Sequence, residues 1–213
     1  DAMVPVAYML PSMAGLEREQ HVLLLFLNNA EMRPGGGFIG SYGIATLEDA
    51  ELTEFETHGV MDIDSPAQSF HNEVPPEAIQ NYLTNDTWYF RDSNWSPDFA
   101  VSTENGLRLY HDQTVGAPAG TEISQPYMSF AAVIGMTPTF VSGLLDIVGP
   151  ITIDDQTFDA DNILTTLEYA VEHGFREDGI PFEQRKEIIG DLADVLKERL
   201  FDLPIDQWGS VFG

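Results

Sequence analysis

The 213-residue sequence contains no cysteine. Disulfide bonds, thiolate metal sites and a cysteine nucleophile are therefore excluded. No apolar stretch reaches the ~18 residues that a membrane-spanning helix needs. Three catalytic signatures are also missing: the HExxH pattern, the Gly-Lys-Ser/Thr phosphate loop and the Gly-x-Ser-x-Gly nucleophile elbow. No motif in the sequence identifies a reaction by itself.

Basic residues are scarce, with 9 Lys and Arg against 35 Asp and Glu and a net charge of −26. A field of this sign repels phosphates and anionic headgroups, so nucleic acid is excluded as a partner through broad electrostatics. The acidic residues either recruit cations or cationic polymers, or keep the protein soluble in a saline or extracellular medium. They form no run of five or six, which favours the second interpretation.

The composition is that of a folded protein, with 43% hydrophobic and 11% aromatic residues. A chain of this length fits one domain with a substantial core. It opens at Asp1 without Met and without the basic start of a signal peptide, so we interpret it as a segment of a longer protein. We expect residues 1–19 to be a lead-in and residues 20–213 to form the domain.

The first half of the chain predicts a sheet. His21–Leu27 is almost purely apolar, which is typical of a central strand covered on both faces. Phe38–Leu47 and Leu52–Val60 predict a strand hairpin. Residues 62–75 are polar and interrupted by Pro66, which predicts a loop.

Further along the chain, helices alternate with short strands. Helices are predicted from Pro75 to Leu83, from Ser96 to about Tyr110, from Thr137 to about Gly149, and over Asp161–His173 and Phe182–Phe201; strands are predicted over Tyr127–Ile134 and Ile151–Ile153. The fold class that follows is α/β: a single-domain sandwich with a mixed, centrally buried sheet and helices on both faces.

The first polar constellation follows the apolar strand. Asn28, Glu31 and Arg33 come at its carboxyl end, where ligand sites of α/β folds tend to lie, and glycines 35–37 allow close backbone approach. One interpretation is an anion or carboxylate site with Arg33 as the charged donor. The other is a tight turn in which Glu31 and Arg33 satisfy each other. Both can hold at once.

The second constellation is the segment Phe90-Arg91-Asp92-Ser93-Asn94-Trp95-Ser96-Pro97-Asp98-Phe99. In the functional interpretation, Asp92 and Asp98 share a hard divalent cation with Asn94, since oxygen ligands suit Mg²⁺ or Ca²⁺. In the structural interpretation, an Arg91–Asp92 pair locks the loop and Asp98 lies favourably near a helix start. The structural interpretation is favoured.

Arg185 belongs to the only basic doublet, Arg185-Lys186, at the predicted start of the last helix. The doublet indicates either a phosphate contact or a solvated helix face paired with Glu183 and Glu187. The second interpretation is favoured.

Together these segments resemble the bacterial family catalogued as domain of unknown function 4012. The resemblance rests on Leu27-Asn28-Asn29-Ala30-Glu31-Met32-Arg33, Gly36-Gly37-Phe38-Ile39-Gly40-Ser41-Tyr42-Gly43, Arg91 to Phe99, Gly149-Pro150, Asp161-Asn162 and Arg185-Lys186. These stretches run in the family's order over about Val22 to Leu200. The resemblance implies an extracytoplasmic domain of an envelope protein that is anchored by an N-terminal transmembrane helix.

A more distant likeness concerns the LytR–CpsA–Psr glycopolymer transferases. The order of an apolar strand, a polar turn and a hairpin is similar to theirs, and so is the order of elements from Met128 to Ile153. Those enzymes move polyprenyl-pyrophosphate-linked glycans onto the cell wall with arginines, aspartates and a magnesium ion. Arg185 stands where those enzymes have an arginine on the last helix, and Arg91-Asp92 is similar to their Arg-Asp pair. Their other Arg-x-Asp and Arg-x-Arg signatures are missing here.

Two functional expectations follow. In the first, one polar site recognises an envelope glycan or its lipid-phosphate carrier; it is formed by Asn28, Glu31, Arg33, Arg91, Asp92, Asn94 and Asp98, with Arg185 as a further contact. In the second, the domain is a Mg²⁺-dependent transferase of pyrophosphate-linked glycans. Arg33 and Arg91, with Arg185 as a third candidate, then stabilise phosphate charge while Asp92 or Asp98 holds the metal.

Overall fold

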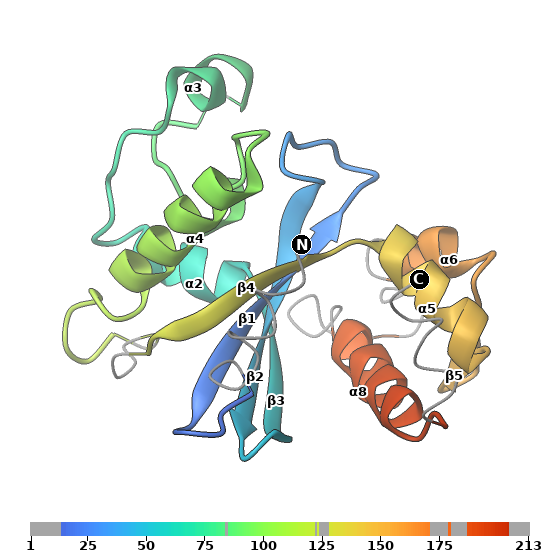
Figure 1. Ribbon diagram of the computed structural model, residues 1–213. Coiled ribbons are helices and arrows are strands. Elements are labelled where there is room, and N and C mark those ends of the chain that lie inside the picture. Colours follow the sequence, from blue (N-terminus) through green and yellow to red (C-terminus); the bar gives the residue numbers. More distant parts are fainter. Residues whose placement is uncertain are drawn as a thin grey trace, which may run out of the picture. The chain divides into compact units, whose positions relative to one another are not determined.

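The computed structural model describes residues 14–83, 85–121, 123, 128–170, 179 and 187–204. The chain divides into two compact units, Asp1–Gly135 and Met136–Gly213 (Figure 1). Among the described residues, no helix is long and apolar enough to cross a bilayer. The predicted lead-in over residues 1–19 and the single domain over 20–213 stay predictions.

The first unit contains a four-stranded sheet in the order β3-β2-β1-β4. Its strands are β1 (Gln20–Asn28), β2 (Phe38–Glu48), β3 (Glu51–Gly59) and β4 (Phe130–Met136). The sheet is mixed. Strands β1 and β2 pair antiparallel, as do β2 and β3, and β4 lies beside β1. Strand β1 is therefore an interior strand, which confirms the prediction made from its apolar run.

Alternate side chains of β1 are buried on opposite faces. Leu23, Leu25 and Leu27 belong to the core cluster, and Val22 and Leu24 are buried as well. A strand covered on both faces has no need of polar residues on either one, which explains its unbroken apolar sequence.

An irregularity in β2 brings its large side chains onto the core face. Phe26 pairs with Ser41 but Leu27 pairs with Ile39, so Gly40 is an extra residue. Such a bulge shifts the alternation by one residue. Ile39 and Tyr42 therefore both join the core cluster although their spacing is odd.

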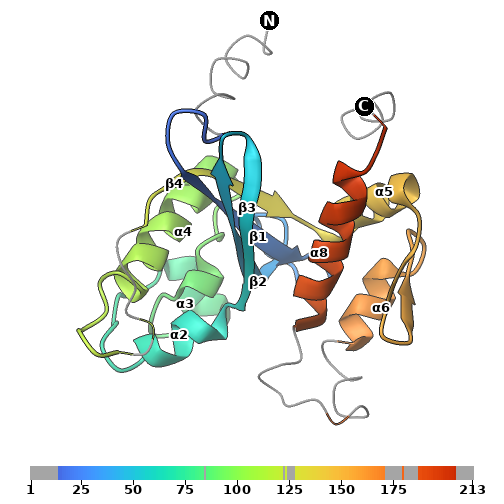
Figure 2. The ribbon, with the colours of Figure 1, turned by 90° about the horizontal axis from the view of Figure 1, so that it is seen from below.

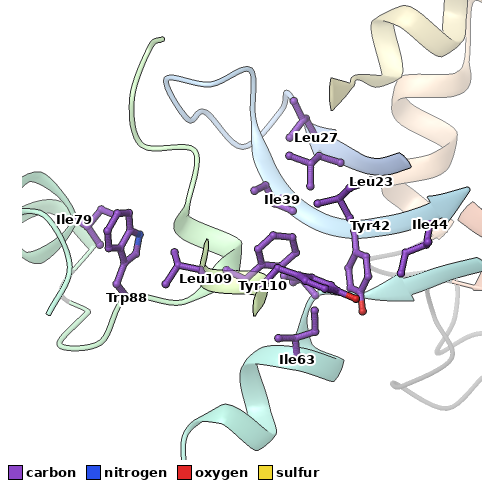
Figure 3. Close-up of a cluster of buried hydrophobic side chains, with 13 residues drawn as sticks. Leu23, Leu27, Ile39, Tyr42, Ile44, Ile63, Ile79, Trp88, Leu109 and Tyr110 are labelled. Carbon is purple, nitrogen blue, oxygen red and sulfur yellow. The ribbon is translucent and has the colours of Figure 1, made fainter. Parts of the chain in front are cut away.

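The described helices of this unit lie over one face of the sheet (Figures 1 and 2). They are α2 (Met61–Ala67), α3 (Glu77–Leu83), the short 3₁₀ helix η1 (Phe90–Asp92) and α4 (Phe99–Gln113). Each contributes to the core: Ile63, Ile79, Phe90, Leu109 and Tyr110 belong to the same buried cluster as Leu23, Leu25 and Leu27 of β1. Figure 3 shows this cluster, with Ile79 beside Trp88. The α/β class with a mixed sheet is thus confirmed.

Helix α2 corrects the loop predicted over residues 62–75. Pro66 removes one backbone donor from the helix interior, and for that reason the sequence indicated a break. Burial compensates, because Ile63 and Ala67 lie one turn apart and are both buried. The Asp62 carboxylate also accepts a hydrogen bond from the Gly59 N–H at 2.9 Å, which supports the start of the helix.

The second unit has its own small core. Its described elements are α5 (Pro138–Val148), the hairpin of β5 (Ile151–Ile153) and β6 (Gln156–Phe158), α6 (Ile163–Tyr169) and α8 (Glu187–Phe201). Thr137 caps α5 through its hydroxyl, as the Thr-Pro start predicts. The core cluster of this unit is formed by Leu144, Leu145, Ile151, Phe158, Ile163, Leu192 and Leu196.

Candidate functional site

The loop between β1 and β2 is held against the segment that follows η1. The Gly35 N–H donates to the Asn94 carbonyl at 3.2 Å, and Asn94 Nδ2 donates to the Gly37 carbonyl at 2.7 Å. A Cβ atom at Gly35 would lie 2.9 Å from the Asn94 side chain, and one at Gly37, where φ is +137°, 2.4 Å from the Asn28 carbonyl oxygen. Gly35 is therefore needed for the close approach to Asn94, which joins the two polar constellations, and Gly37 for the tight fold of the loop onto Asn28.

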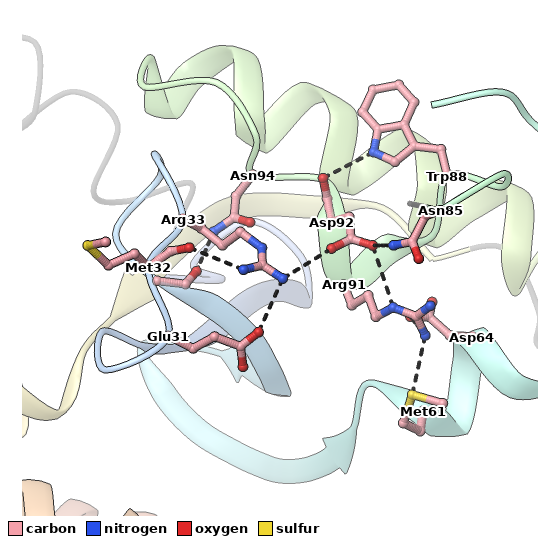
Figure 4. Close-up of polar contacts among 11 residues, drawn as sticks. Glu31, Met32, Arg33, Met61, Asp64, Asn85, Trp88, Arg91, Asp92 and Asn94 are labelled. Atoms are coloured by element: carbon pink, nitrogen blue, oxygen red, sulfur yellow. Dashed lines mark hydrogen bonds and ion pairs between the residues drawn. The ribbon is translucent and has the colours of Figure 1, made fainter. Parts of the chain in front are cut away.

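The two constellations meet at Asp92, in what we call the Asp92 cluster: Glu31, Arg33, Asp64, Asn85, Arg91 and Asp92 (Figure 4). Asp92 is 2% exposed. Its Oδ1 lies 3.6 Å from Arg33 Nη2, and its Oδ2 accepts from Asn85 Nδ2 at 3.0 Å and lies 3.5 Å from Arg91 Nε. One buried carboxylate is thus held by two guanidinium groups and an amide.

Arg33 is occupied on both terminal nitrogens. Nη2 donates to Glu31 Oε1 at 3.2 Å, and Nη1 donates to the Met32 carbonyl at 3.1 Å. The guanidinium also lies over the Phe38 ring, 5.2 Å from its centroid. The tight-turn interpretation of this loop, with Glu31 and Arg33 satisfying each other, is confirmed.

Arg91 connects Asp92 to a second buried carboxylate, Asp64 of α2. Arg91 Nη1 lies 3.6 Å from Asp64 Oδ2 and donates to the sulfur of Met61 at 3.5 Å. The predicted Arg91–Asp92 pair is therefore confirmed. It belongs to a longer chain of alternating charges that runs from Glu31 through Asp92 to Asp64.

Asp64 is fully buried and receives hydrogen bonds from two other segments. The Phe90 N–H lies 3.2 Å from its Oδ1. The Gln113 amide, in the orientation that satisfies both its ends, donates to the same oxygen at 2.8 Å. Burial raises the pKa of Asp64 to about 7, although Arg91 opposes the rise.

Unsatisfied polar atoms gather in this region. In the described part of the chain, the buried side-chain atoms that lack a hydrogen bond include Arg33 Nε, Asp64 Oδ2, Ser93 Oγ, Asn94 Oδ1 and Trp95 Nε1. Buried polar groups are ordinarily paired, so such a concentration marks a region where the fold tolerates a local cost. Functional sites are where such costs are commonly found.

A pocket of about 200 Å³ adjoins the cluster. It is lined by Met32, Arg33, Pro34, Ala78, Ile79, Tyr82, Leu83, Asp92 and Trp95. Most of these residues are apolar, and Arg33 and Asp92 are the charged residues of the lining. Met32 and Tyr82 are strongly exposed at this pocket, at 87% and 85%. Large apolar groups exposed beside convergent polar groups are typical of a binding site.

Not every predicted site residue reaches the cluster. The Asn28 side chain closes a local turn by accepting from the Ala30 N–H at 3.0 Å. Asp98 caps α4, accepting from the Ala100 N–H at 2.9 Å, which confirms its position at a helix start. Asn94 holds the loop, as described above. Arg185 lies outside the described residues.

The predicted magnesium site does not fit this arrangement. The Asp92 carboxylate is engaged by Arg33, Arg91 and Asn85, whereas the Asp98 carboxylate is engaged by a helix N-terminus. Over the described ranges, His, Cys, Asp and Glu form no group of three or more that could hold a metal ion. Oxygen ligands already bonded to cationic and amide donors are poorly available to Mg²⁺.

Several members of the region were missed from the sequence. Asp64 lies in the segment predicted to be a loop, and Asn85 and Gln113 belong to no dense polar stretch. Trp88 donates its indole N–H to the Asp92 carbonyl at 3.1 Å. For Asp64, the one available signal was its place beside the apolar pair Ile63 and Ala67, whose spacing of four suits a helix.

Comparison with known proteins identifies a family but no function. No curated protein matches the chain. The family model described as "Protein of unknown function (DUF4012)" matches residues 17–171, which include β1 to β6 and all residues of the Asp92 cluster. Since the match covers more than half of the 213 residues, the chain belongs to the DUF4012 family.

Proposed function

We propose that the chain is a ligand-recognition domain that binds a cell-envelope glycan or its lipid-phosphate carrier at the Asp92 cluster. The observation that carries the proposal is the meeting of Arg33, Arg91 and Asp92 beside an apolar pocket with exposed walls. Location outside the cytoplasm on a membrane-anchored protein belongs to the same proposal and rests on the family resemblance of the sequence.

The chemistry of the pocket supports recognition of an amphipathic ligand. Tyr82 and Trp95 offer aromatic surface, and Arg33 and Asp92 offer a donor and an acceptor at one end. Arg33 is itself held by Glu31 and Asp92, so its guanidinium is oriented before a ligand arrives. A site oriented in advance loses less free energy to ordering on binding.

The test is isothermal titration of the purified chain with two kinds of ligand: soluble cell-wall glycan fragments and a polyprenyl phosphate in detergent micelles. We expect saturable binding of at least one of them. Arg33→Gln is expected to weaken it by roughly tenfold, the effect of losing one hydrogen bond from a charged group. Arg18→Gln removes the same charge from an exposed position outside the cluster and should leave the affinity unchanged.

Because Arg33→Gln leaves Asp92 with fewer donors, its thermal unfolding must be measured alongside. Tyr82→Ala provides a second variant with little effect on folding, because that side chain is 85% exposed. Binding that survives both substitutions places the ligand elsewhere. Failure of every glycan and of the polyprenyl phosphate to bind contradicts the proposal.

The transferase alternative rests on the same convergence of Arg33 and Arg91. Both guanidinium groups are neutralised by carboxylates, and Asp92 and Asp98 do not form a metal-ligand group, so the geometry supports recognition better than phosphoryl chemistry. The deciding assay incubates the chain with a polyprenyl-pyrophosphate-linked glycan, Mg²⁺ and a range of acceptors. Turnover lost in Arg33→Ala and Arg91→Ala would favour the transferase.

A further inference from the structure

The Asp92 cluster carries no surplus of positive charge. Arg33 and Arg91 contribute two positive charges, and Glu31, Asp64 and Asp92 contribute three negative ones, which gives −1 when all five are ionised. Proton uptake by Asp64 brings the sum only to zero. A phosphate dianion is stabilised by uncompensated cationic donors, which this cluster does not supply. The net charge of −26 opposes an anion further.

The cluster and the pocket wall offer both acceptors and donors of hydrogen bonds. Arg33 already donates to Glu31 and to the Met32 carbonyl, and its remaining Nη2 contact faces Asp92. Its Nε and the Nε1 of Trp95, which also lines the pocket, have no acceptor among the described residues. The carboxylates keep more capacity, because an ionised carboxylate has about four acceptor sites. The Glu31 side chain, which is bonded to Arg33 of the pocket lining, is 51% exposed. A ligand that fits should therefore both donate to the carboxylates and accept from these donors, which hydroxyl groups do, whereas a phosphate dianion only accepts.

The pocket, of about 200 Å³, has walls that suit a sugar ring. Apolar walls with the Tyr82 ring at the rim suit the apolar face of a sugar, whose hydroxyls then lie toward the charged end.

We infer that the group bound at this pocket is an uncharged sugar, whose hydroxyls donate to Glu31 and Asp92 and accept from Arg33, rather than a phosphate. This inference rests on the proposed function and selects one of its two ligand classes.

The test uses matched ligand pairs that differ by one phosphate group. Glucose, galactose, mannose and N-acetylglucosamine are titrated by protein-observed NMR, each against its own 1-phosphate, with polyprenyl phosphate in micelles as a further arm. We expect at least one neutral sugar to bind several-fold more tightly than its 1-phosphate. Its affinity should change little between 50 and 300 mM NaCl, because no ion pair with the ligand is involved.

Glu31→Gln is expected to change the affinity for a neutral sugar and the affinity for a phosphate in opposite directions. The substitution removes an acceptor and one negative charge, so neutral sugar binding should weaken by roughly five- to tenfold. Binding of a phosphate should instead strengthen, because the cluster loses a competitor for Arg33. Glu54→Gln makes the same change at an exposed position of β3 and serves as the matched control.

The outcomes are distinct. Tighter binding of a 1-phosphate or of polyprenyl phosphate, or a gain of affinity in Glu31→Gln, overturns the inference and leaves the proposed function standing. If no ligand of the panel binds, the proposed function fails and the inference fails with it.

Discussion

Asp64 is a carboxylate without solvent exposure, held by Arg91, by the Phe90 N–H and by the Gln113 amide. These groups come from η1 and α4, so the residue connects α2 to both. Its charged form is disfavoured by burial, and the ion pair with Arg91 offsets this only in part. The native state therefore binds a proton at Asp64 more readily than the unfolded chain does.

Asp64 is expected to make stability fall as the pH rises. The folded pKa of about 7 lies above the unfolded value of 3.8, so the native state holds more protons between these two values. The free energy of unfolding should then decrease from about pH 4 to pH 7. In Asp64→Asn, the difference in unfolding free energy between pH 5 and pH 8 should shrink by up to about 3 kcal/mol, measured by urea denaturation.

The control for this prediction is Asp62→Asn, an exposed residue of the same helix. It removes the same charge, so it accounts for the general relief of repulsion in an acidic protein. Equal changes of the pH dependence in the two variants would contradict a special role for Asp64.

Asp98 is expected to act as a helix cap and not as a ligand to a metal or substrate. Its Oδ1 accepts from the Ala100 N–H, so Asp98→Ala should lower the free energy of unfolding by about 1 kcal/mol. Asp98→Ser keeps a capping oxygen and should recover most of the loss. Ligand affinity measured by titration should be unchanged in both; a large loss of affinity in Asp98→Ser would restore Asp98 as a site residue.

Among the elements, the β2–β3 hairpin has a backbone that is strained at its turn. Its two-residue turn places Asp49 at φ 51° and Ala50 at φ 64°. Positive φ at both positions matches the right-handed twist of the strands, and it is unfavourable for Ala. The backbone N–H groups of both residues are fixed by the carbonyls of Gly15 and Ala14, so the turn cannot relax freely.

Ala50→Gly should therefore stabilise the first unit by about 1 kcal/mol, because glycine adopts positive φ without steric cost. The measurement is chemical denaturation of the full chain. Ala100→Gly, in the first turn of α4, should have the opposite effect, since glycine is a poor helix former. A loss of stability in Ala50→Gly would show that the turn is not strained.

The sequence predicted elements well where one residue type dominates a segment. The interior strand, the hairpin and the starts of α4 and α5 follow from apolar runs and from capping residues. Helix α2 was missed because Pro66 is a local signal, whereas the burial of Ile63 and Ala67 is a tertiary effect. The bulge at Gly40 was missed for a similar reason, since register depends on both strands.

The sequence identified several residues of the candidate site, but not which residues meet there. Arg33, Arg91 and Asp92 were identified because they lie in dense polar stretches. These residues meet because Asn94 is hydrogen-bonded to Gly35 and Gly37, and such contacts between distant segments form only in the folded chain. Asp64 contributes through burial, and a single sequence contains little information about the burial of one acidic residue in a short helix.

For the whole molecule, the net charge of −26 governs the response to cations. Any divalent cation should stabilise the fold by reducing repulsion among 35 acidic residues. Because the predicted ligands do not form a metal site in the described residues, Mg²⁺ and Ca²⁺ should raise the melting temperature equally at equal concentration. Differential scanning fluorimetry of the wild type and Asp92→Asn measures this. A shift specific to Mg²⁺ that disappears in Asp92→Asn would contradict it.

Two of the three tryptophans of the chain lie at the candidate site. Trp88 is buried with its indole on the Asp92 carbonyl, and Trp95 lines the pocket. The intrinsic fluorescence of the unlabelled protein should thus report directly on occupancy. A ligand that displaces water from Trp95 should move its emission to shorter wavelength, while the enclosed indole of Trp88 supplies a nearly constant background. Screening of large chemical libraries against this domain needs no attached dye.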